Sequence, residues 1–158
     1  MSYALLATDG ELSRHDGEVD WEAALGPEGR VRVSLLPNLA VAAYVNDCGL
    51  RYPDRYPRNE VGSCLLVALG ASPKPYAGNI VFVGWNAANT ARGLIEIEPL
   101  RPRLADMVEE IHGDVRRALA GDLPRELSPS WGEQMREIAE LVWTAPTPTL
   151  TVRTVRLP

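Results

Sequence analysis

The chain has 158 residues, 46% hydrophobic and 23% charged, with a formal net charge of −5 at pH 7. This is the composition of one globular domain, and it argues against extensive disorder and against a duplex-DNA binder, which normally carries a clustered basic face. No apolar run reaches the length of a membrane span, and the start lacks a basic signal-peptide region, so we expect a cytoplasmic protein. Two cysteines are too few for a disulfide framework.

Hydrophobic periodicity and turn residues predict a series of short elements. Asp9 and Gly10 form a strong hairpin signal between two apolar segments. Alternation over 31–35 indicates a half-buried strand, whereas the β-branched run at 79–83 indicates a central one. In chain order we expect strands over 3–7, 11–15, 31–35, 41–45, 79–83, 94–98 and 149–157, and helices over 21–25, 60–69, 103–120 and 129–143.

Capping residues mark the expected helix ends. Asp20 and Asn59 are good N-cap residues, and Gly26 and Gly70 stand where C-terminal glycines belong. The helix over 103–120 carries an apolar stripe at spacings of three and four, which predicts packing on a core.

The order of these elements favours an α+β fold, a mixed β-sheet with helices on one face. A β-grasp-like core is one specific arrangement of this kind. We expect a core domain over 1–98 and a C-terminal extension of two helices and a strand over 99–158, packed on the core as one unit.

Polar and turn residues concentrate between positions 40 and 85, so any site is expected there. The segment RYPDRYPRN alternates aromatic, proline and basic residues between two strong strands. Tyrosine and arginine supply stacking and bidentate hydrogen bonds, and both recur in binding hot spots. The candidate binding residues are Asn46, Asp47, Arg51, Tyr52, Arg55, Tyr56, Arg58, Asn59, Trp85 and Asn86.

Each candidate also has a structural interpretation. The tyrosines can cover the core while the arginines pair with Asp47 and Asp54. Asn46 and Asp47 can stabilise their own turn through side-chain to backbone hydrogen bonds, and Asn59 can serve as a helix cap. Because connecting loops are common, the sequence favours these structural interpretations for each residue taken singly.

Several chemistries are disfavoured. Cys48 and Cys64 are the nucleophile candidates, but the only histidines, His15 and His112, lie in other predicted elements. Cysteines and histidines lack the paired short spacings of structural zinc sites, and no Walker A or GxGxxG pattern occurs. We therefore expect no metal and no cofactor.

Short motifs follow one another in a characteristic order over residues 1–98. They are Asp9-Gly10, Asp20-Trp21, Tyr44-Val45-Asn46-Asp47-x-Gly49, Pro57-Arg58-Asn59 and Gly78-x-Ile80-Val81-Phe82-Val83-Gly84. In this order they resemble a family of small domains of unknown function from high-GC bacteria, plasmids and phages. The resemblance implies no activity and no catalytic or binding residues.

The sequence leaves function hypotheses of three classes open. The leading one is a non-enzymatic accessory or regulatory module that binds a protein or small ligand through the Arg/Tyr-rich loop. The second is a small hydrolase or transferase acting on a nucleotide-like substrate, with Asp47 as acid/base and Arg58 as anion clamp. The third is a nucleic-acid-related or DNA-mimicking protein of mobile elements. No membrane partner is expected, and a homodimer is left open.

Overall fold

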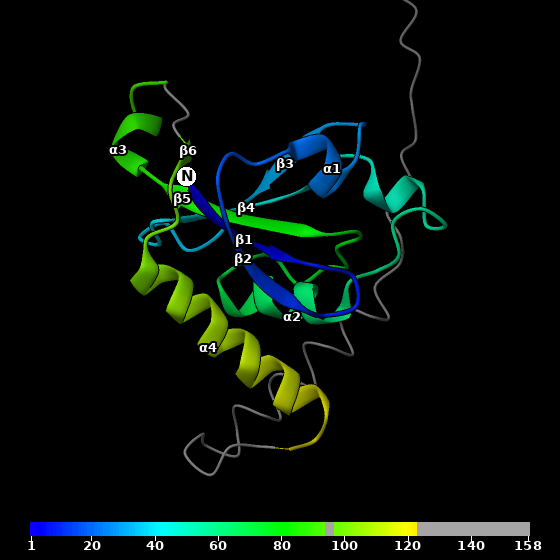
Figure 1. The fold of residues 1–158 in the computed structure, drawn as a ribbon. Coiled ribbons are helices and arrows are strands. Elements are labelled where there is room, and N and C mark those ends of the chain that lie inside the picture. The colour runs from blue at the N-terminus through cyan, green and yellow to red at the C-terminus, as the bar shows by residue number, and fades with distance from the viewer. Residues whose placement is uncertain (94–96, 123–158) are drawn as a thin grey trace, which may run out of the picture.

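The computed structural model describes residues 1–93 and 97–122, and these form an antiparallel sheet with helices packed on it (Figure 1). The α+β class is therefore confirmed. The strands are β1 (Ser2–Leu6), β2 (Leu12–Asp16), β3 (Arg30–Val33), β4 (Val41–Asn46), β5 (Ile80–Trp85) and β6 (Ile97–Glu98). The helices are α1 (Trp21–Leu25), α2 (Glu60–Ala68), α3 (Ala87–Thr90) and α4 (Pro102–Leu119), with a 3₁₀ turn η1 (Gly49–Arg51).

The strand order is β2-β1-β5-β4-β3, and β6 pairs with β5 beyond the end of β1. β5 is central, as its β-branched run predicts. Every pairing among the described strands is antiparallel, where the sequence analysis expects a mixed sheet. Direct reversals of the chain join β1 to β2 and β3 to β4, which makes these two pairs antiparallel. β1 and β5 also run antiparallel, so the chain does not form a β-grasp-like core with parallel central strands.

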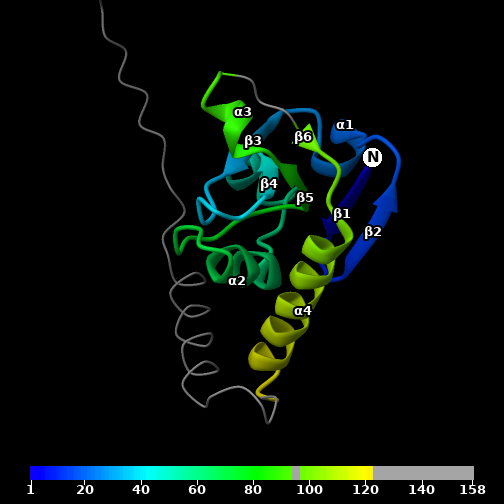
Figure 2. The same cartoon turned by 90° about the vertical axis from the view of Figure 1, so that its left-hand side faces the viewer.

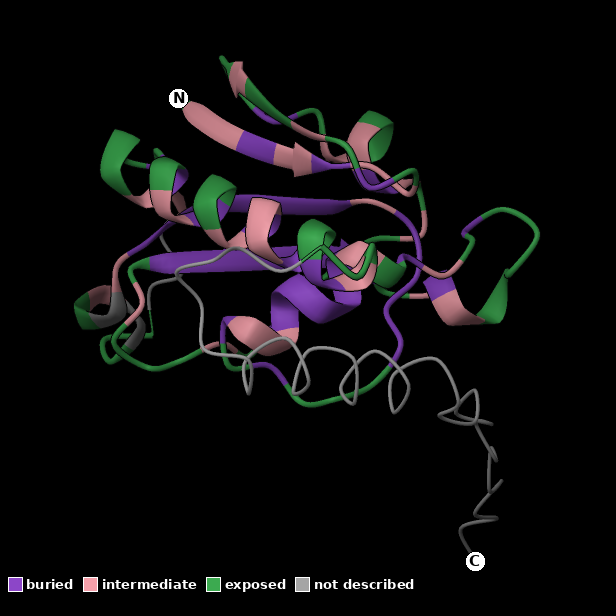
Figure 3. Ribbon diagram, turned by 90° about the horizontal axis from the view of Figure 1, so that it is seen from below, coloured by how far each residue is buried: buried purple, intermediate pink, exposed green. Residues whose placement is uncertain are grey.

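The helices do not all lie on one face. Figures 1 and 2 show α2 and α4 together below the sheet, as expected, with α1 on the opposite side. α1 covers that second face because Leu25 is buried, and Trp21 packs on Tyr44 of β4. Figure 3 shows β4 and β5 buried along their length, while the outer side of α4 is exposed.

Some element bounds differ from those expected. β3 ends at Val33 because the chain then turns toward the end of α2, where the Leu36 amide donates to the Leu69 carbonyl at 3.0 Å. The short helix α3 forms inside a stretch expected to be loop, and only β6 is described of the strand expected over 94–98. The helix expected over 129–143 and the strand expected over 149–157 lie outside the described residues.

α4 shares one hydrophobic core with the sheet. Leu100, Ala105 and Val108 belong to the same buried cluster as Phe82 of β5. The His112 ring nitrogen Nε2 lies 2.7 Å from the Gly10 carbonyl oxygen, which ties α4 to the first hairpin. Core packing is thus continuous across the boundary expected at residue 98.

None of the helices in the described ranges combines the length and apolar character that a membrane span requires.

Candidate functional site

A cavity of about 320 Å³ lies beside the edge of β3. Its walls come from β3, from the turn at 47–51 and from the loop at 72–77, and include Val31, Val33, Asp47, Cys48, Arg51 and Lys74. This volume is at the lower end of the range for small-ligand sites, and apolar and charged groups are mixed as such sites require.

Buried hydrogen bonds hold the loop at 72–77 against α2. The Tyr76 amide donates to Ser63 Oγ at 2.9 Å, and Ser63 Oγ donates to the Asn59 carbonyl at 2.7 Å. The Asn59 backbone N–H in turn donates to the Tyr76 carbonyl at 2.8 Å. Gly49 permits the opposite wall to come close, because a Cβ there would lie 3.1 Å from the Ala77 carbonyl oxygen. The cavity is therefore framed by backbone that is fixed in place.

Two cations of the cavity have no ion-pair partner among the described residues. Elsewhere arginines are paired, for example Arg14 with Asp106 at 2.6 Å and Arg116 with Glu11 at 2.8 Å. Arg51 has no recorded carboxylate partner, and Lys74 has none either, its ammonium lying 5.4 Å from the centre of a tyrosine ring. The cavity is thus lined by two cations that form no ion pair within the described part of the protein, and by one carboxylate, that of Asp47.

The two cysteines differ in environment. Cys64 is fully buried in α2, and burial, together with the nearby Glu60 carboxylate, raises the pKa of its thiol to about 11. Such a thiol is an unreactive core group. Cys48 is partly exposed and lines the cavity.

Asn46, Arg55 and Tyr56 belong to a polar cluster centred on Glu28. The Tyr56 hydroxyl and the Arg55 guanidinium both donate to the Glu28 carboxylate, and the Asn46 amide donates to it at 3.0 Å. Asn46 also accepts from the Cys48 amide at 2.8 Å, which confirms its role in its own turn. A smaller cavity of about 200 Å³ lies beside this cluster and is lined by Arg55 and Tyr56. These residues connect loops, and their polar groups are already engaged.

The cluster makes the stability of the protein sensitive to acid. The hydrogen bond from Tyr56, then that from Asn46 and the charge of Arg55, lower the pKa of Glu28 to about 2, although partial burial acts the other way. An unfolded glutamate titrates near 4.3, so this contribution is complete above about pH 4.5 and is lost as the pH falls toward 2. We expect Glu28→Gln to flatten the fall in unfolding free energy between these pH values, measured by urea titration.

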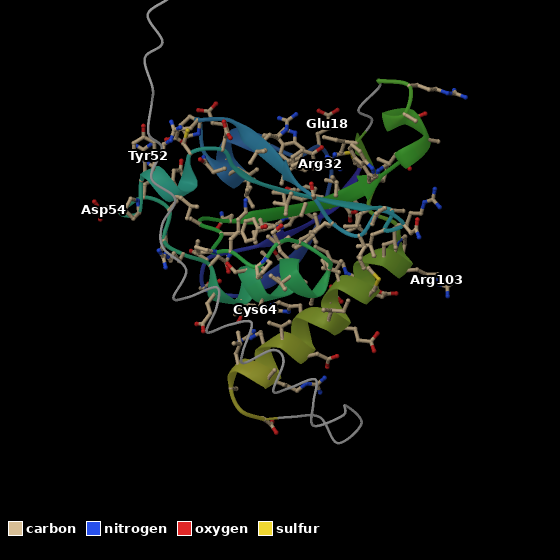
Figure 4. The ribbon with its side chains drawn as sticks, turned by 180° about the vertical axis from the view of Figure 1, so that it is seen from behind. Glu18, Arg32, Tyr52, Asp54, Cys64 and Arg103 are labelled. Carbon is tan, nitrogen blue, oxygen red and sulfur yellow. The ribbon has the colours of Figure 1, made fainter. Side chains whose placement is uncertain are left out.

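Glu18→Gln is the matched control, because Glu18 is exposed and its side chain makes no hydrogen bond or ion pair with the described residues (Figure 4). Its acid profile should follow that of the wild type. An acid profile of Glu28→Gln that also coincides with the wild type would contradict the role of the cluster.

Asn59 is a helix cap, as its structural interpretation predicts. Its side chain is fully buried and accepts from the Gly62 amide at 2.8 Å. Its amide nitrogen donates to the carbonyls of Ala7 and Gly78 at 3.1 and 3.0 Å. Both amide hydrogens and the amide oxygen of the side chain make hydrogen bonds, and the side chain is buried, so it is not open to a ligand. Its neighbour Arg58 is partly buried and forms a β-bridge with Ala77.

Trp85 and Asn86 lie far from the arginine-tyrosine loop. The Trp85 amide donates to the Ala40 carbonyl at 3.0 Å, at the start of β4, whereas Asn46 ends that strand. Six residues of extended chain separate the two places by roughly 20 Å. Trp85 is buried beneath the Arg32 guanidinium, 4.2 Å from its ring centre, and the Asn86 amide donates to Glu98. The candidates therefore do not form one surface.

Of the expected residues, the structure brings Asn46, Asp47 and Arg51 to the larger cavity. Arg58 and Asn59 do not line it, so the acid Asp47 and the anion clamp Arg58 of the enzyme hypothesis do not meet there. Tyr52 is 49% exposed and stands away from the core beside Asp54 (Figure 4), while Tyr56 is buried. The tyrosine pair thus divides between surface and interior.

Sequence reasoning missed two residues of these sites. Lys74 is the only lysine of the chain and stands between two prolines, a signal that could have drawn attention to it. Glu28 gave no local signal, because its partners Arg55 and Tyr56 are 27 and 28 positions away.

Within the described ranges, no three histidine, cysteine or acidic side chains lie together in a way that could hold a metal ion. No protein-family model, curated protein or solved structure matches this chain. The resemblance of residues 1–98 to a family of small bacterial and phage domains remains a prediction.

Proposed function

We propose that this chain is a non-enzymatic binding module that recognises an anionic group, a carboxylate or a phosphate, on a protein or small ligand. The group would occupy the cavity beside β3, against Arg51 and Lys74. The observation that supports this most is the absence of an ion-pair partner for either cation among the described residues, at a cavity with fixed walls.

The chemistry follows from the residue types. An arginine can bind a carboxylate or phosphate through two parallel hydrogen bonds, while lysine adds a compact charge. The apolar walls formed by Val31 and Val33 can cover the rest of a ligand. Asp47 is also a wall residue and would oppose an anion, so it limits the affinity and favours ligands that also offer a hydrogen-bond donor.

The alkylation rate of the Cys48 thiol can be used to measure the positive charge of the cavity. Iodoacetate is an anion and iodoacetamide is a neutral analogue, so the ratio of their alkylation rates at one pH measures the local potential. We expect Arg51→Gln to lower this ratio at Cys48 about threefold, the size of one unit charge acting through water at about 6 Å. Asp47→Asn should raise the ratio, and added salt should weaken both effects.

Arg103→Gln is the matched control, because Arg103 is exposed in α4 on the far side of the molecule from Tyr52 (Figure 4). It removes the same charge and should leave the ratio unchanged. Peptide mapping verifies that Cys48 and not the buried Cys64 carries the label. A ratio equal to that of free cysteine and indifferent to Arg51→Gln would refute the proposed site.

A further inference from the structure

β3 is an edge strand with open backbone groups. Among the described strands it pairs only with β4, and the Asp47 amide donates to the Gly29 carbonyl at 3.2 Å. Because hydrogen-bonded residues alternate along an antiparallel strand, Gly29, Val31 and Val33 face β4. The N–H and C=O groups of Arg30 and Arg32 therefore point to the free edge.

The faces on either side of this edge carry positive charge. On one face the guanidinium groups of Arg30 and Arg32 lie over the rings of Trp21 and Trp85, at 4.1 and 4.2 Å from their centres. On the other face Val31, which is 43% exposed, adjoins the cavity lined by Arg51 and Lys74. A strand added here would have its side chains alternate between the arginine face and the cavity.

Charge decides which strand fits. A second copy of the chain pairing edge to edge would bring Arg30 and Arg32 against the same arginines, and like charges directly opposite each other are destabilising. The chain's own residues 149–158 contain Arg153 and Arg156 and no acidic residue, so they meet the same repulsion. A segment with acidic side chains meets complementary charge on both faces.

We propose that β3 accepts an extended acidic peptide segment of a partner protein as an added strand, with one carboxylate side chain in the cavity. This rests on the proposed function, whose anion-binding cavity it uses. The backbone of the segment forms hydrogen bonds with the outward N–H and C=O groups of Arg30 and Arg32, as in other sheet-edge recognition. Its carboxylate pairs with Arg51 and Lys74. The apolar surface of Val31 favours a β-branched neighbour of that carboxylate.

The test is a selection of random nine-residue peptides displayed on phage against the full chain. We expect enrichment of peptides in which acidic and β-branched residues alternate. The best peptide, labelled with fluorescein, should bind the protein in a polarisation assay. Exchanging its acidic residue for the amide, or methylating alternate backbone nitrogens, should weaken binding at least tenfold.

Two variants of Arg32 distinguish the contribution of its backbone N–H to peptide binding from that of its side chain. Arg32→Pro removes the outward N–H, which an edge strand tolerates because the bonds to β4 remain, whereas Arg32→Ala removes only the side chain. Binding should fall at least tenfold for Arg32→Pro and at most about threefold for Arg32→Ala, at preserved melting temperatures. If Arg32→Pro does not fold, the methylated peptides test the same hydrogen bonds.

The outcomes distinguish this inference from the function on which it rests. No enriched peptide, or binding that methylation leaves unchanged, overturns the added strand, while a charge-dependent iodoacetate ratio at Cys48 would keep the anion site. A ratio at Cys48 that does not respond to Arg51→Gln would refute both the anion site and the added strand. Displacement of the selected peptide by a synthetic peptide of residues 149–158, or dimerisation abolished by Arg32→Pro, would assign the edge to the chain itself and overturn the proposal.

Discussion

Replacing Asn59 with alanine should lower the free energy of unfolding by about 3 kcal/mol. Loss of an N-cap costs about 1 kcal/mol, and the buried Gly78 carbonyl left without its donor adds roughly 1–2. The lost bond to the Ala7 carbonyl adds less, because that carbonyl also accepts from the Gly10 amide. The cap of α2 and the bonds to Ala7 and Gly78 are all lost together. Because domains are stable by only about 5–15 kcal/mol, this is a large part of the total. Urea unfolding followed by circular dichroism measures it.

Asp20→Ala is the control that isolates the capping contribution. Asp20 caps α1 in the same way, its side chain accepting from the Ala23 amide at 3.0 Å, but it is exposed and this side chain makes no further hydrogen bond with the described residues. Its loss should cost about 1 kcal/mol or less. Asn59→Ser can restore the cap but not the bonds to Ala7 and Gly78, so its cost in unfolding free energy should lie between those of Asp20→Ala and Asn59→Ala. Equal costs for Asn59→Ala and Asp20→Ala would mean that the bonds to Ala7 and Gly78 contribute nothing.

Asn59 also illustrates which part of the fold the sequence encodes locally. Caps and tight turns depend on a few adjacent residues, so Asp20, Asn59 and the Asp9-Gly10 hairpin were all predicted correctly. The same local polarity made Asn59 look like a candidate ligand residue. Burial decides between the two roles, and burial depends on the whole fold.

The candidate site depended on how distant segments meet. Asn46 and Trp85 are the last residues of two apolar strands, and in a parallel pair they would lie at the same end of the sheet. β4 and β5 are antiparallel, with Val41 opposite Gly84, so the two residues lie at opposite ends. The cavity likewise combines 31–34, 47–51 and 72–77, whose proximity is set by sheet order and by the Ser63 link. No periodicity within one segment carries that information.

Replacing Gly84 with alanine should be as damaging as the loss of Asn59. A Cβ at this position would lie 2.3 Å from the Pro99 carbonyl oxygen and 2.9 Å from that of Glu98, both of them backbone atoms. β6 must then move off β5, and with it Leu100, whose amide donates to the Ser2 carbonyl at 2.7 Å. Overpacking costs about 1–3 kcal/mol, and displacing the segment that leads into α4 brings the expected loss to about 3 kcal/mol or more.

Gly113→Ala makes the same chemical change in a different setting. Gly113 lies inside α4, and a Cβ there meets nothing within 4 Å. Alanine removes the backbone freedom of glycine in the unfolded chain, so this variant should gain about 0.5–1 kcal/mol. We expect urea titrations to give changes in unfolding free energy of opposite sign for the two variants, and faster amide exchange along α4 only for Gly84→Ala. This result would show that the close approach of Pro99 to Gly84 holds α4 in place. A neutral Gly84→Ala would mean that β6 can retreat without releasing α4.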